Sequence, residues 1–306
     1  MKKQTIILAI FLSLCYSARA QQEYKITHNA GRLIVNDLLS VTIEGYDGSD
    51  IIFTSRRAPE EEDPRAKGLQ ALNSSGLKDN TGLGISVVKN DQEVQVTPVS
   101  SNGDRNEMLR IRVPQQVAVV FIGKTTSADT IAVKNMKGEI ELSSTYHRIA
   151  LENNSGPMNI KSIHGDIDAS FGTDVKGPIS IISAYGHVDV ALPTVTKANL
   201  SMGSSYGKLY ASDEFNIVVT PQSNDNEDQL SEIATSLSGT SSVSVASSRS
   251  ATRTTSRTSL PAMVYEAGAV NIFAFRERES IKGTLNGGGI DLILRSTHQN
   301  VYLRTK

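Results

Sequence analysis

A repeat in residues 129–211 constrains the fold of this chain more than any other feature. Its short units begin nine or twelve residues apart, at Asp129, Gly138, His147, Gly156, Gly165, Gly177, Gly186, Ala198 and Gly207. The second and fourth residues after each start are apolar in all nine units, which makes eighteen apolar positions, and the residues between them are mostly polar. Apolar side chains at every second position are typical of a β-strand with one buried face. The repeat therefore predicts nine short strands, most of them opened by a glycine that suits a tight turn.

The units also pair at a longer period, which predicts how the strands stack. Starts two units apart are separated by 21 residues in two series, Gly156–Gly177–Ala198 and Gly165–Gly186–Gly207. A coil of 18–21 residues that returns to the same register is typical of a parallel β-solenoid, in which each coil buries its apolar face against the next. We therefore expect an all-β, β-helix-like solenoid with two strands per coil. Antiparallel hairpins are the alternative, because nine-residue steps leave about four residues for each turn.

The first twenty residues are expected to form a secretory signal peptide. Lys2 and Lys3 precede an apolar run over residues 6–14, and Ala18-Arg19-Ala20 matches the A-x-A cleavage pattern. We expect export to the periplasm, the outer membrane or the extracellular space. Cys15 is the only cysteine, so the mature chain would hold no disulfide and no cysteine metal site. No later apolar run reaches eighteen residues, so no transmembrane anchor is expected.

The charge and the motifs exclude several classes of function. Cleavage would remove Lys2, Lys3 and Arg19 and change the formal charge from −1 to −4, which argues against a nucleic-acid partner. The chain has no P-loop and no dinucleotide fingerprint, so no cofactor is expected.

Composition divides the mature chain into four regions. Residues 21–122 are an N-terminal β region expected to cap the open end of the solenoid, with strands at 32–35, 40–44, 50–54, 84–89, 93–97, 109–113 and 117–122. An Asn90-Asp91 hairpin turn and a charged loop at 56–67 lie among them. Residues 123–220 hold the coils, and 221–262 are a Ser/Thr-rich insertion expected to be disordered. Residues 263–306 are expected to close the same domain, with a sharp corner at 286–289 and strands at 264–266, 270–275, 283–285, 290–294 and 301–303.

Stacking the coils in this register aligns several side chains that can bind a partner. Tyr146, His164, Tyr185 and Tyr206 share one column, with neighbours about 5 Å apart. Such a strip can contact a glycan or protein, or it can stack against itself and stiffen a corner. Asp166, Asp168 and Asp189 project from the outer face of the second strand, where paired carboxylates can act as acid and base or bind calcium.

These carboxylates do not converge on an active site in the predicted register. The column through them reads Ala150, Asp168, Asp189 and Tyr210, and Lys208 is the only basic residue expected nearby. The histidines show no ligand spacing, so no metal site is expected. We expect no catalytic residue, and the candidate binding residues are Tyr146, His164, Tyr185, Tyr206, Asp168 and Asp189.

Several stretches resemble a known family. They are LKDNTGLGI at 77–85, the Gly-x-Ile-x-Leu coils of 138–211, IKGTLNGGG at 281–289 and QNVYLR at 299–304. These stretches resemble the secreted bacterial β-strand-repeat proteins of the putative-adhesin family, whose common domain has no known function. The resemblance covers residues 24–220 and 263–306 and implies a parallel β-solenoid in the cell envelope, with no catalytic residues to carry over. The Ser/Thr-rich insertion has no counterpart in that pattern.

Three hypotheses for function follow. The first is a non-enzymatic envelope protein whose surface binds a protein or polysaccharide. The second is a polysaccharide-cleaving enzyme that uses Asp168 and Asp189. The third is an accessory protein of envelope-stress signalling. The ligand, the side of an outer membrane on which the protein lies and its oligomeric state are left open by the sequence.

Overall fold

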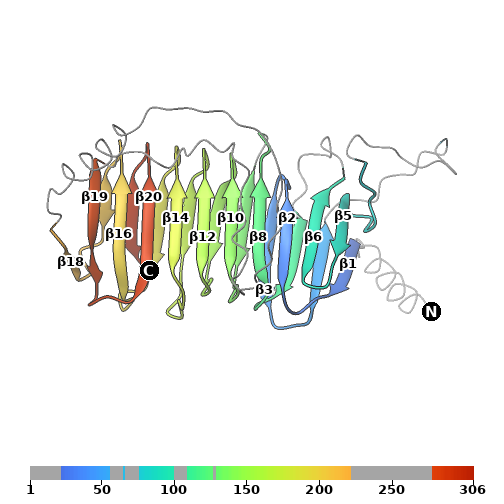
Figure 1. Cartoon of the computed structure of the whole chain (residues 1–306), viewed down its shortest axis with the longest axis horizontal. Coiled ribbons are helices and arrows are strands. Elements are labelled where there is room, and N and C mark those ends of the chain that lie inside the picture. Colours follow the sequence, from blue (N-terminus) through green and yellow to red (C-terminus); the bar gives the residue numbers. More distant parts are fainter. Residues whose placement is uncertain (1–21, 56–64, 66–75, 100–108, 127–128, 222–277) are drawn as a thin grey trace, which may run out of the picture. The chain divides into compact units, whose positions relative to one another are not determined.

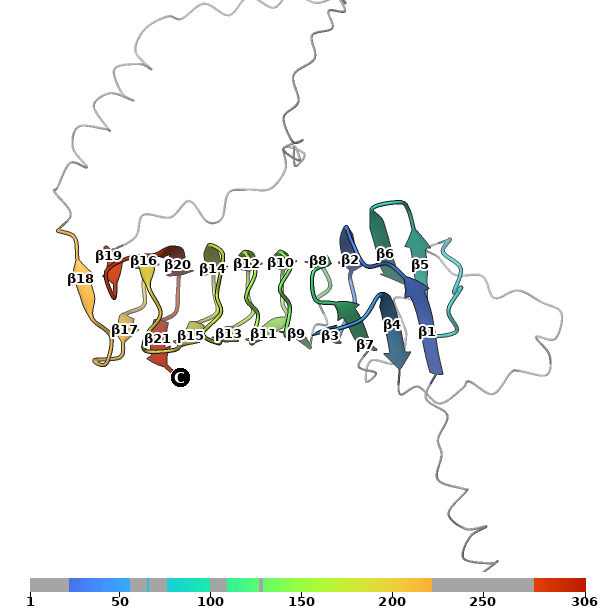
Figure 2. The ribbon, with the colours of Figure 1, turned by 90° about the horizontal axis from the view of Figure 1, so that it is seen from below.

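The described part of the protein consists entirely of β-strands and connecting turns. The computed structural model describes residues 22–55, 65, 76–99, 109–126, 129–221 and 278–306. Within them there is no α-helix, and the strands form a ten-stranded sheet A and an eleven-stranded sheet B whose neighbours are mostly parallel. Figure 1 looks onto sheet B, and Figure 2 shows the two sheets as separate layers. The predicted signal peptide, the Ser/Thr-rich insertion and the loop at 56–67, except Arg65, lie outside the described residues.

All strands of the described residues belong to one compact unit. One apolar cluster lies between the two sheets and receives side chains from both. None of the described residues forms a helix that is long and apolar enough to cross a membrane.

The repeat of residues 129–211 forms the nine predicted strands, which alternate between the sheets (Figure 2). Sheet A takes β9 (Thr130–Lys134), β11 (Arg148–Glu152), β13 (Ile167–Ser170), β15 (Val188–Leu192) and β17 (Leu209–Ala211). Sheet B takes β10 (Ile140–Ser144), β12 (Met158–Ser162), β14 (Ile179–Ser183) and β16 (Ala198–Ser204). Sixteen of the eighteen predicted inward side chains are buried. The other two, Leu209 and Ala211, are partly or fully exposed because β17 is an edge strand.

The central strands follow the predicted period. Ile140 of β10 lies opposite Met158 of β12, which lies opposite Ile179 of β14, so parallel partners are 18 or 21 residues apart. Strands of sheet A keep the same spacing, with Ile149 opposite Ile167 and Ile167 opposite Val188. The period and the inward register are therefore confirmed between β9 and β15.

The glycines that open the units are required by close contact between coils, which corrects the tight-turn explanation. A Cβ on Gly156 would lie 2.2 Å from the carbonyl oxygen of Gly138, and a Cβ on Gly165 would lie 1.7 Å from that of His147. Neither glycine has a positive φ. Glycine is needed there because one coil passes directly against the backbone of the coil before it.

The C-terminal coil corrects the predicted stacking order. The 21-residue steps placed β16 beside β14 and β17 beside β15. In the structure, β20 (Ile290–Ser296) lies between β14 and β16, and β21 (Val301–Thr305) lies between β15 and β17. The inserted strands repeat the inward pattern of the coils, because Leu292, Leu294, Val301 and Leu303 are all buried. The predicted strands at 283–285, 290–294 and 301–303 are confirmed, whereas those at 264–266 and 270–275 lie outside the described residues.

A tight loop carries the chain into this inserted coil. β19 (Glu279–Leu285) pairs antiparallel with one edge of β16, and β20 pairs parallel with its other edge, so residues 286–289 cross the end of β16. Asn286, Gly287 and Gly288 have φ angles of 50°, 87° and 87°, which confirms the predicted sharp corner. Asn286 Nδ2 donates to the carbonyl oxygens of Thr194 and Thr196, both at 2.7 Å, and so holds the loop against the connection that it crosses.

The N-terminal end contains a second inserted coil. β2 (Arg32–Asn36) lies between the later strands β6 and β8 of sheet B, and β3 (Val41–Tyr46) lies between β7 and β9 of sheet A. All seven predicted N-terminal strands form; the others are β4 (Asp50–Ser55), β5 (Ile85–Lys89), β6 (Glu93–Pro98), β7 (Leu109–Pro114) and β8 (Ala118–Gly123). The predicted Asn90-Asp91 turn joins β5 and β6 as an antiparallel hairpin. β1 (Gln22–Thr27) was not predicted.

The sheets end differently at their four edges. β1, β5 and β18 (Ile217–Val219) are edge strands that pair antiparallel with their neighbours. The fourth edge strand, β17, has only three residues and pairs parallel with β21. Within the described residues, this edge of sheet A is therefore the one that ends on a short parallel strand.

Candidate binding surface

A column of stacked aromatic rings, here called the aromatic strip, follows the turns that lead into sheet A. Its members are Tyr146, His164, Tyr185, His298 and Tyr206. The predicted column had four members, with Tyr185 next to Tyr206. His298 lies between these two rings because the C-terminal coil is inserted there. The four predicted residues are therefore brought together, with one histidine added.

The rings of the strip cover one another's faces. Successive centroids are 4.7, 4.8, 4.3 and 5.0 Å apart, with interplanar angles between 11° and 22°. Tyr146, Tyr185 and Tyr206 are 42%, 46% and 64% exposed. Because the faces inside the column are covered, the inner rings present mainly their edges and polar atoms to solvent.

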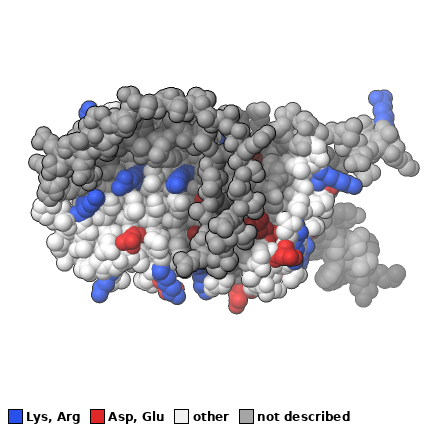
Figure 3. Space-filling view, viewed as in Figure 1, with Lys and Arg blue, Asp and Glu red and all other residues white. Residues whose placement is uncertain are grey.

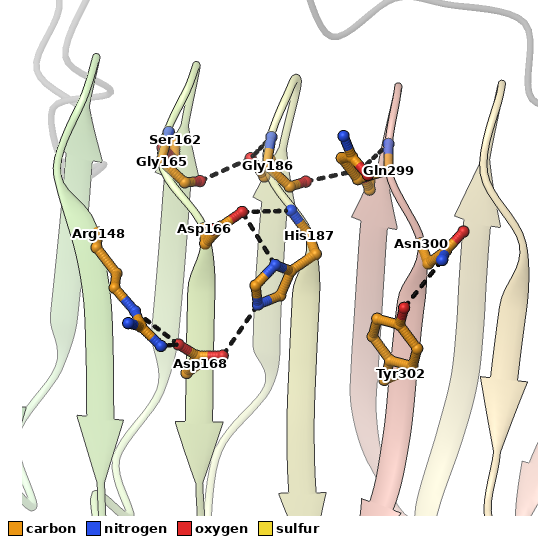
Figure 4. A network of polar contacts seen from close by, with 12 residues as sticks. Arg148, Ser162, Gly165, Asp166, Asp168, Gly186, His187, Gln299, Asn300 and Tyr302 are labelled. Atoms are coloured by element: carbon orange, nitrogen blue, oxygen red, sulfur yellow. Dashed lines mark hydrogen bonds and ion pairs between the residues drawn. The ribbon is translucent and has the colours of Figure 1, made fainter.

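A ladder of buried serines lies at the corner between sheet B and this strip, and the sequence reasoning did not identify it. The serines end the sheet-B strands, at Ser144, Ser162, Ser183, Ser296 and Ser204, and all are buried. Ser183 Oγ accepts from Gly186 N and donates to Gly165 O, both at 2.9 Å, and Ser296 Oγ donates to Gly186 O at 2.8 Å (Figure 4). Each serine follows the start of its unit by six residues, which is a signal that the sequence does contain. The ladder joins neighbouring coils directly beneath the exposed rings.

A polar cluster on the outer face of sheet A surrounds Asp168 (Figure 4). Arg148 Nε donates to Asp168 Oδ2 at 2.9 Å, and His187 Nε2 lies 3.1 Å from Asp168 Oδ1. The other ring nitrogen of His187 lies 3.0 Å from Asp166 Oδ1. The expectation that Lys208 is the only basic residue near these carboxylates is therefore wrong. An arginine side chain is long enough to reach a carboxylate on the neighbouring strand, so a residue can have partners outside its own register column.

The second candidate carboxylate is also paired with an arginine. Both oxygens of Asp189 accept from Arg304 Nε at 2.9 Å. Tyr302 lies between Asp189 and Tyr210 in the column, so the predicted order Ala150, Asp168, Asp189, Tyr210 lacked one member. Asp168 and Asp189 are on adjacent strands, as predicted, but each is bound to its own guanidinium.

The pairing controls the protonation of Asp168. Burial alone would raise the pKa of its carboxyl, but the bonds from Arg148 and His187 hold that pKa below the ordinary value. Asp168 is therefore ionised at neutral pH and is poorly suited to donate a proton.

The remaining histidines do not form a metal site. His147 is fully buried, packs edge-on against Phe121 at 5.3 Å and places Nε2 2.8 Å from the carbonyl oxygen of Leu38. Burial lowers the pKa of His147. Within the described ranges there is no group of three or more His, Cys, Asp or Glu side chains arranged to hold a metal ion.

One stretch that carried the family resemblance forms a compact loop before β5. Asp79 Oδ1 accepts from the backbone nitrogens of Thr81 and Gly82 at 2.9 Å, and Oδ2 accepts from Gly84 N at 2.8 Å. Burial would raise the pKa of Asp79, but these bonds lower it overall. The carboxylate organises the loop and is engaged within it.

A shallow depression lies at the end of sheet A where β17 stops. Its volume is about 370 Å³, and it is lined by Tyr210, Ala211, Ser212, Tyr302, Leu303, Arg304 and Thr305. The rings of Tyr210 and Tyr302 stack at 5.3 Å, and the Arg304 guanidinium lies 5.0 Å from the centroid of Tyr302. None of the predicted site residues lines this depression.

Comparisons with known proteins identify no family. No protein-family model matches the chain, and no curated protein matches its sequence. Among solved structures, a "putative cell adhesion protein" from Clostridium sporogenes matches with a TM-score of 0.39 and 9% identity, over 94% of this chain and 100% of that one. At that score the likeness carries no argument about function.

Proposed function

We propose that this chain is a secreted, non-enzymatic protein of the cell envelope that presents an extended binding surface to a protein or polysaccharide partner. We further propose that its two sheets are the faces of one parallel β-solenoid. The alternation of consecutive strands between the sheets at 18 or 21 residues per coil supports this architecture. The family resemblance of the sequence points in the same direction.

One observation carries the proposal: the outer face of sheet A bears three rows of mostly polar and aromatic side chains across five neighbouring strands. The first row is the aromatic strip. The second row is Arg148, Asp166, His187, Asn300 and Lys208, and the third is Ala150, Asp168, Asp189, Tyr302 and Tyr210. Rows at strand spacing offer regular contacts to an elongated partner. A compact catalytic pocket would not need such rows along the stack.

Charge does not favour a nucleic-acid partner. On the face seen in Figure 3, the visible Lys, Arg, Asp and Glu side chains are interspersed with uncharged surface. On the outer face of sheet A, Arg148 and Arg304 are offset by Asp168 and Asp189. A phosphate backbone would need an excess of positive charge.

The enzymatic alternative requires Asp168 or Asp189 to act as an acid. Both carboxylates are bound to arginines, and the lowered pKa of Asp168 opposes proton donation at neutral pH. We therefore expect that neither the wild type nor an Asp168→Asn, Asp189→Asn double variant cleaves glycans. Release of reducing ends from an envelope polysaccharide by the wild type, lost in this variant, would establish the enzyme instead.

A pull-down of the mature protein against envelope extract tests the proposed function. The extract is divided into a protein fraction and a polysaccharide fraction, and retention of either one is the expected result. Contacts spread over several coils predict that Tyr185→Ala or Asp189→Ala alone weakens retention by less than about threefold. A large loss from either single substitution would indicate a compact site. Retention of neither fraction would contradict the proposal, and a signalling protein crosslinked in membranes would favour the accessory role.

A further inference from the structure

The geometry points to a carbohydrate subsite in the depression at the end of sheet A. We propose that one pyranose unit of a polysaccharide stacks on Tyr210 and is hydrogen-bonded by the polar groups beside it. This inference rests on the proposed binding function and narrows it to one ligand class and one place. Tyr210 does not belong to the residues that the sequence singled out as binding candidates.

Stacking on a sugar requires an aromatic ring with an uncovered face, and few exposed rings of this surface have one. Tyr146 and Tyr210 end their columns and each stacks on one ring, but only Tyr210 of these two lines the depression. Tyr185 lies between His164 and His298, and both of its faces are covered. Tyr302 has Tyr210 at 5.3 Å and the Arg304 guanidinium at 5.0 Å. Tyr206 has His298 on one face and the Arg278 guanidinium 5.6 Å from its centroid.

Tyr210 differs because no strand follows β17 in sheet A. Its ring stacks on Tyr302 with an interplanar angle of 9°, which leaves the opposite face directed away from the sheet. The side chain is 46% exposed. An aromatic face at the edge of a depression is suited to the C–H groups of a pyranose ring.

The depression also supplies hydrogen-bonding groups next to this ring. β17 ends at Ala211, whereas β21 continues to Thr305, so the depression lies beside the last residues of β21. Arg304 uses Nε for both of its bonds to Asp189, and the residue also lines the depression. A guanidinium has further N–H donors on its two terminal nitrogens. Ser212 and Thr305, which both carry hydroxyl groups, are among the lining residues. Hydroxyl and guanidinium groups around one aromatic face match the alternating hydroxyl and C–H groups of a sugar.

The same geometry disfavours two other ligands. A peptide that adds a strand would have to pair with the outer edge of β17, which is only three residues long. A free anion would find the charge of Arg304 offset by Asp189. A neutral sugar requires neither a long strand edge nor a net positive charge.

Saturation-transfer NMR on the full mature chain tests the site, with a panel of methyl pyranosides of glucose, galactose, mannose and N-acetylglucosamine as the probes. We expect transfer to the ring C–H protons of at least one sugar. Tyr210→Ala should weaken that binding at least about tenfold, and Tyr210→Phe should retain it, because the phenyl ring keeps the stacking face. Ser180→Ala, on the outer face of sheet B, is the control and should bind like the wild type. Tyr185→Ala tests the aromatic strip, and because the faces of this ring are covered it should weaken binding by less than about threefold.

Each outcome decides the assignment. Equal binding by Tyr210→Ala and the wild type, with unchanged melting temperatures, would overturn the site. An equal loss in Tyr185→Ala would move the ligand to the aromatic strip. If no pyranoside shows transfer while the envelope pull-down still retains a partner, the carbohydrate assignment fails and the proposed binding function survives. If Tyr210→Ala reduces retention of a protein in that pull-down, the depression is a protein contact.

Discussion

The central coils and the two ends of this molecule are held by similar hydrogen bonds, but the bonded residues are separated by very different distances in the sequence. From β9 to β15, the strands pair with one another at separations of 18 or 21 residues. At the C-terminal end, Ser296 Oγ donates to Gly186 O, 110 residues earlier in the chain. At the N-terminal end, the buried His147 contacts Leu38 O, 109 residues earlier. A periodic sequence thus determines the shape of a coil, whereas the order of the coils depends on contacts that close long loops.

Deleting one coil from each region should give the largest contrast. Loss of residues 290–306 removes β20 and β21, so β14 and β16 lose their shared partner and Leu200 loses its neighbour Leu292. We expect residues 198–219 to unfold in this variant. Loss of residues 156–176 removes a whole central coil but lets Gly177 take the place of Gly156, so this variant should still unfold cooperatively with a lower melting temperature. Circular dichroism melts of both variants test the contrast, which fails if the C-terminal truncation melts as cooperatively as the internal deletion.

A charge placed inside a central coil should lower the free energy of unfolding less than the loss of the inserted coil does, but more than a substitution at the surface does. Ile179 is 1% exposed, whereas Ser180 lies on the outer face of the same strand. Ile179→Asp should lower the free energy of unfolding by about 3 kcal/mol or more, because the carboxylate has no partner. Ser180→Asp should change it by less than about 0.5 kcal/mol. Urea unfolding measures both values, and equal effects would contradict the register of β14.

The serine ladder permits a matched comparison of a local and a long-range contact. Ser183→Ala and Ser296→Ala each leave buried backbone groups without a partner, so each should cost about 1–3 kcal/mol. We expect Ser183→Ala to slow folding and Ser296→Ala mainly to accelerate unfolding, because the inserted coil must dock late. Stopped-flow kinetics separate the two effects, with Ser180→Ala as the control. A folding rate reduced equally by both substitutions would show that the inserted coil forms together with the central ones.

A lower pH should destabilise the attachment of the N-terminal coil, by less than the substitutions above. Burial lowers the pKa of His147 below 6.5, although its contact with Leu38 O and the charges of Asp37 and Asp129 oppose that shift. At this histidine the folded state therefore binds fewer protons than the unfolded state. The contribution of neutral His147 to the free energy of unfolding is complete above pH 6.5 and declines as the pH falls below that value. The urea midpoint should be lower at pH 5.5 than at pH 7.5. His147→Gln should reduce this difference but leave the part due to His28, whose pKa is also lowered by burial and by Lys89.

The sequence predicts the central coils well because their contacts are local. Sixteen inward residues were assigned correctly, and the stacking of Tyr146, His164 and Tyr185 followed from their spacing. The step from Gly177 to Ala198 has the same length as a true coil, yet β14 and β16 are not neighbours. Leu292 and Leu294 meet Ile179 and Ile181 on one side and Leu200 and Met202 on the other, in the same register. An inserted coil with matching side chains therefore leaves no trace in the period of its neighbours.

The units that form the inserted coil lack the glycine that marks most of the others. Ile290 and Gln299 are nine residues apart and are followed by the expected apolar pairs, so the pattern was present without its clearest marker. His298 and Tyr302 were missed for this reason. The arginine partners of Asp168 and Asp189 were missed because a long side chain can cross from one strand to the next.

The crossing at Asn286 has a consequence for how this protein is made. The ribosome produces the chain from its N-terminus, so β14 and β16 exist long before β20 is available to lie between them. A nascent chain that has reached Thr220 contains β14 and β16 but lacks β20, the strand that pairs with both. Val301 and Leu303 likewise enter sheet A between β15 and β17, which are both synthesised before them. The interior at this end of the molecule is therefore completed by strands that are synthesised after the strands on both sides of them.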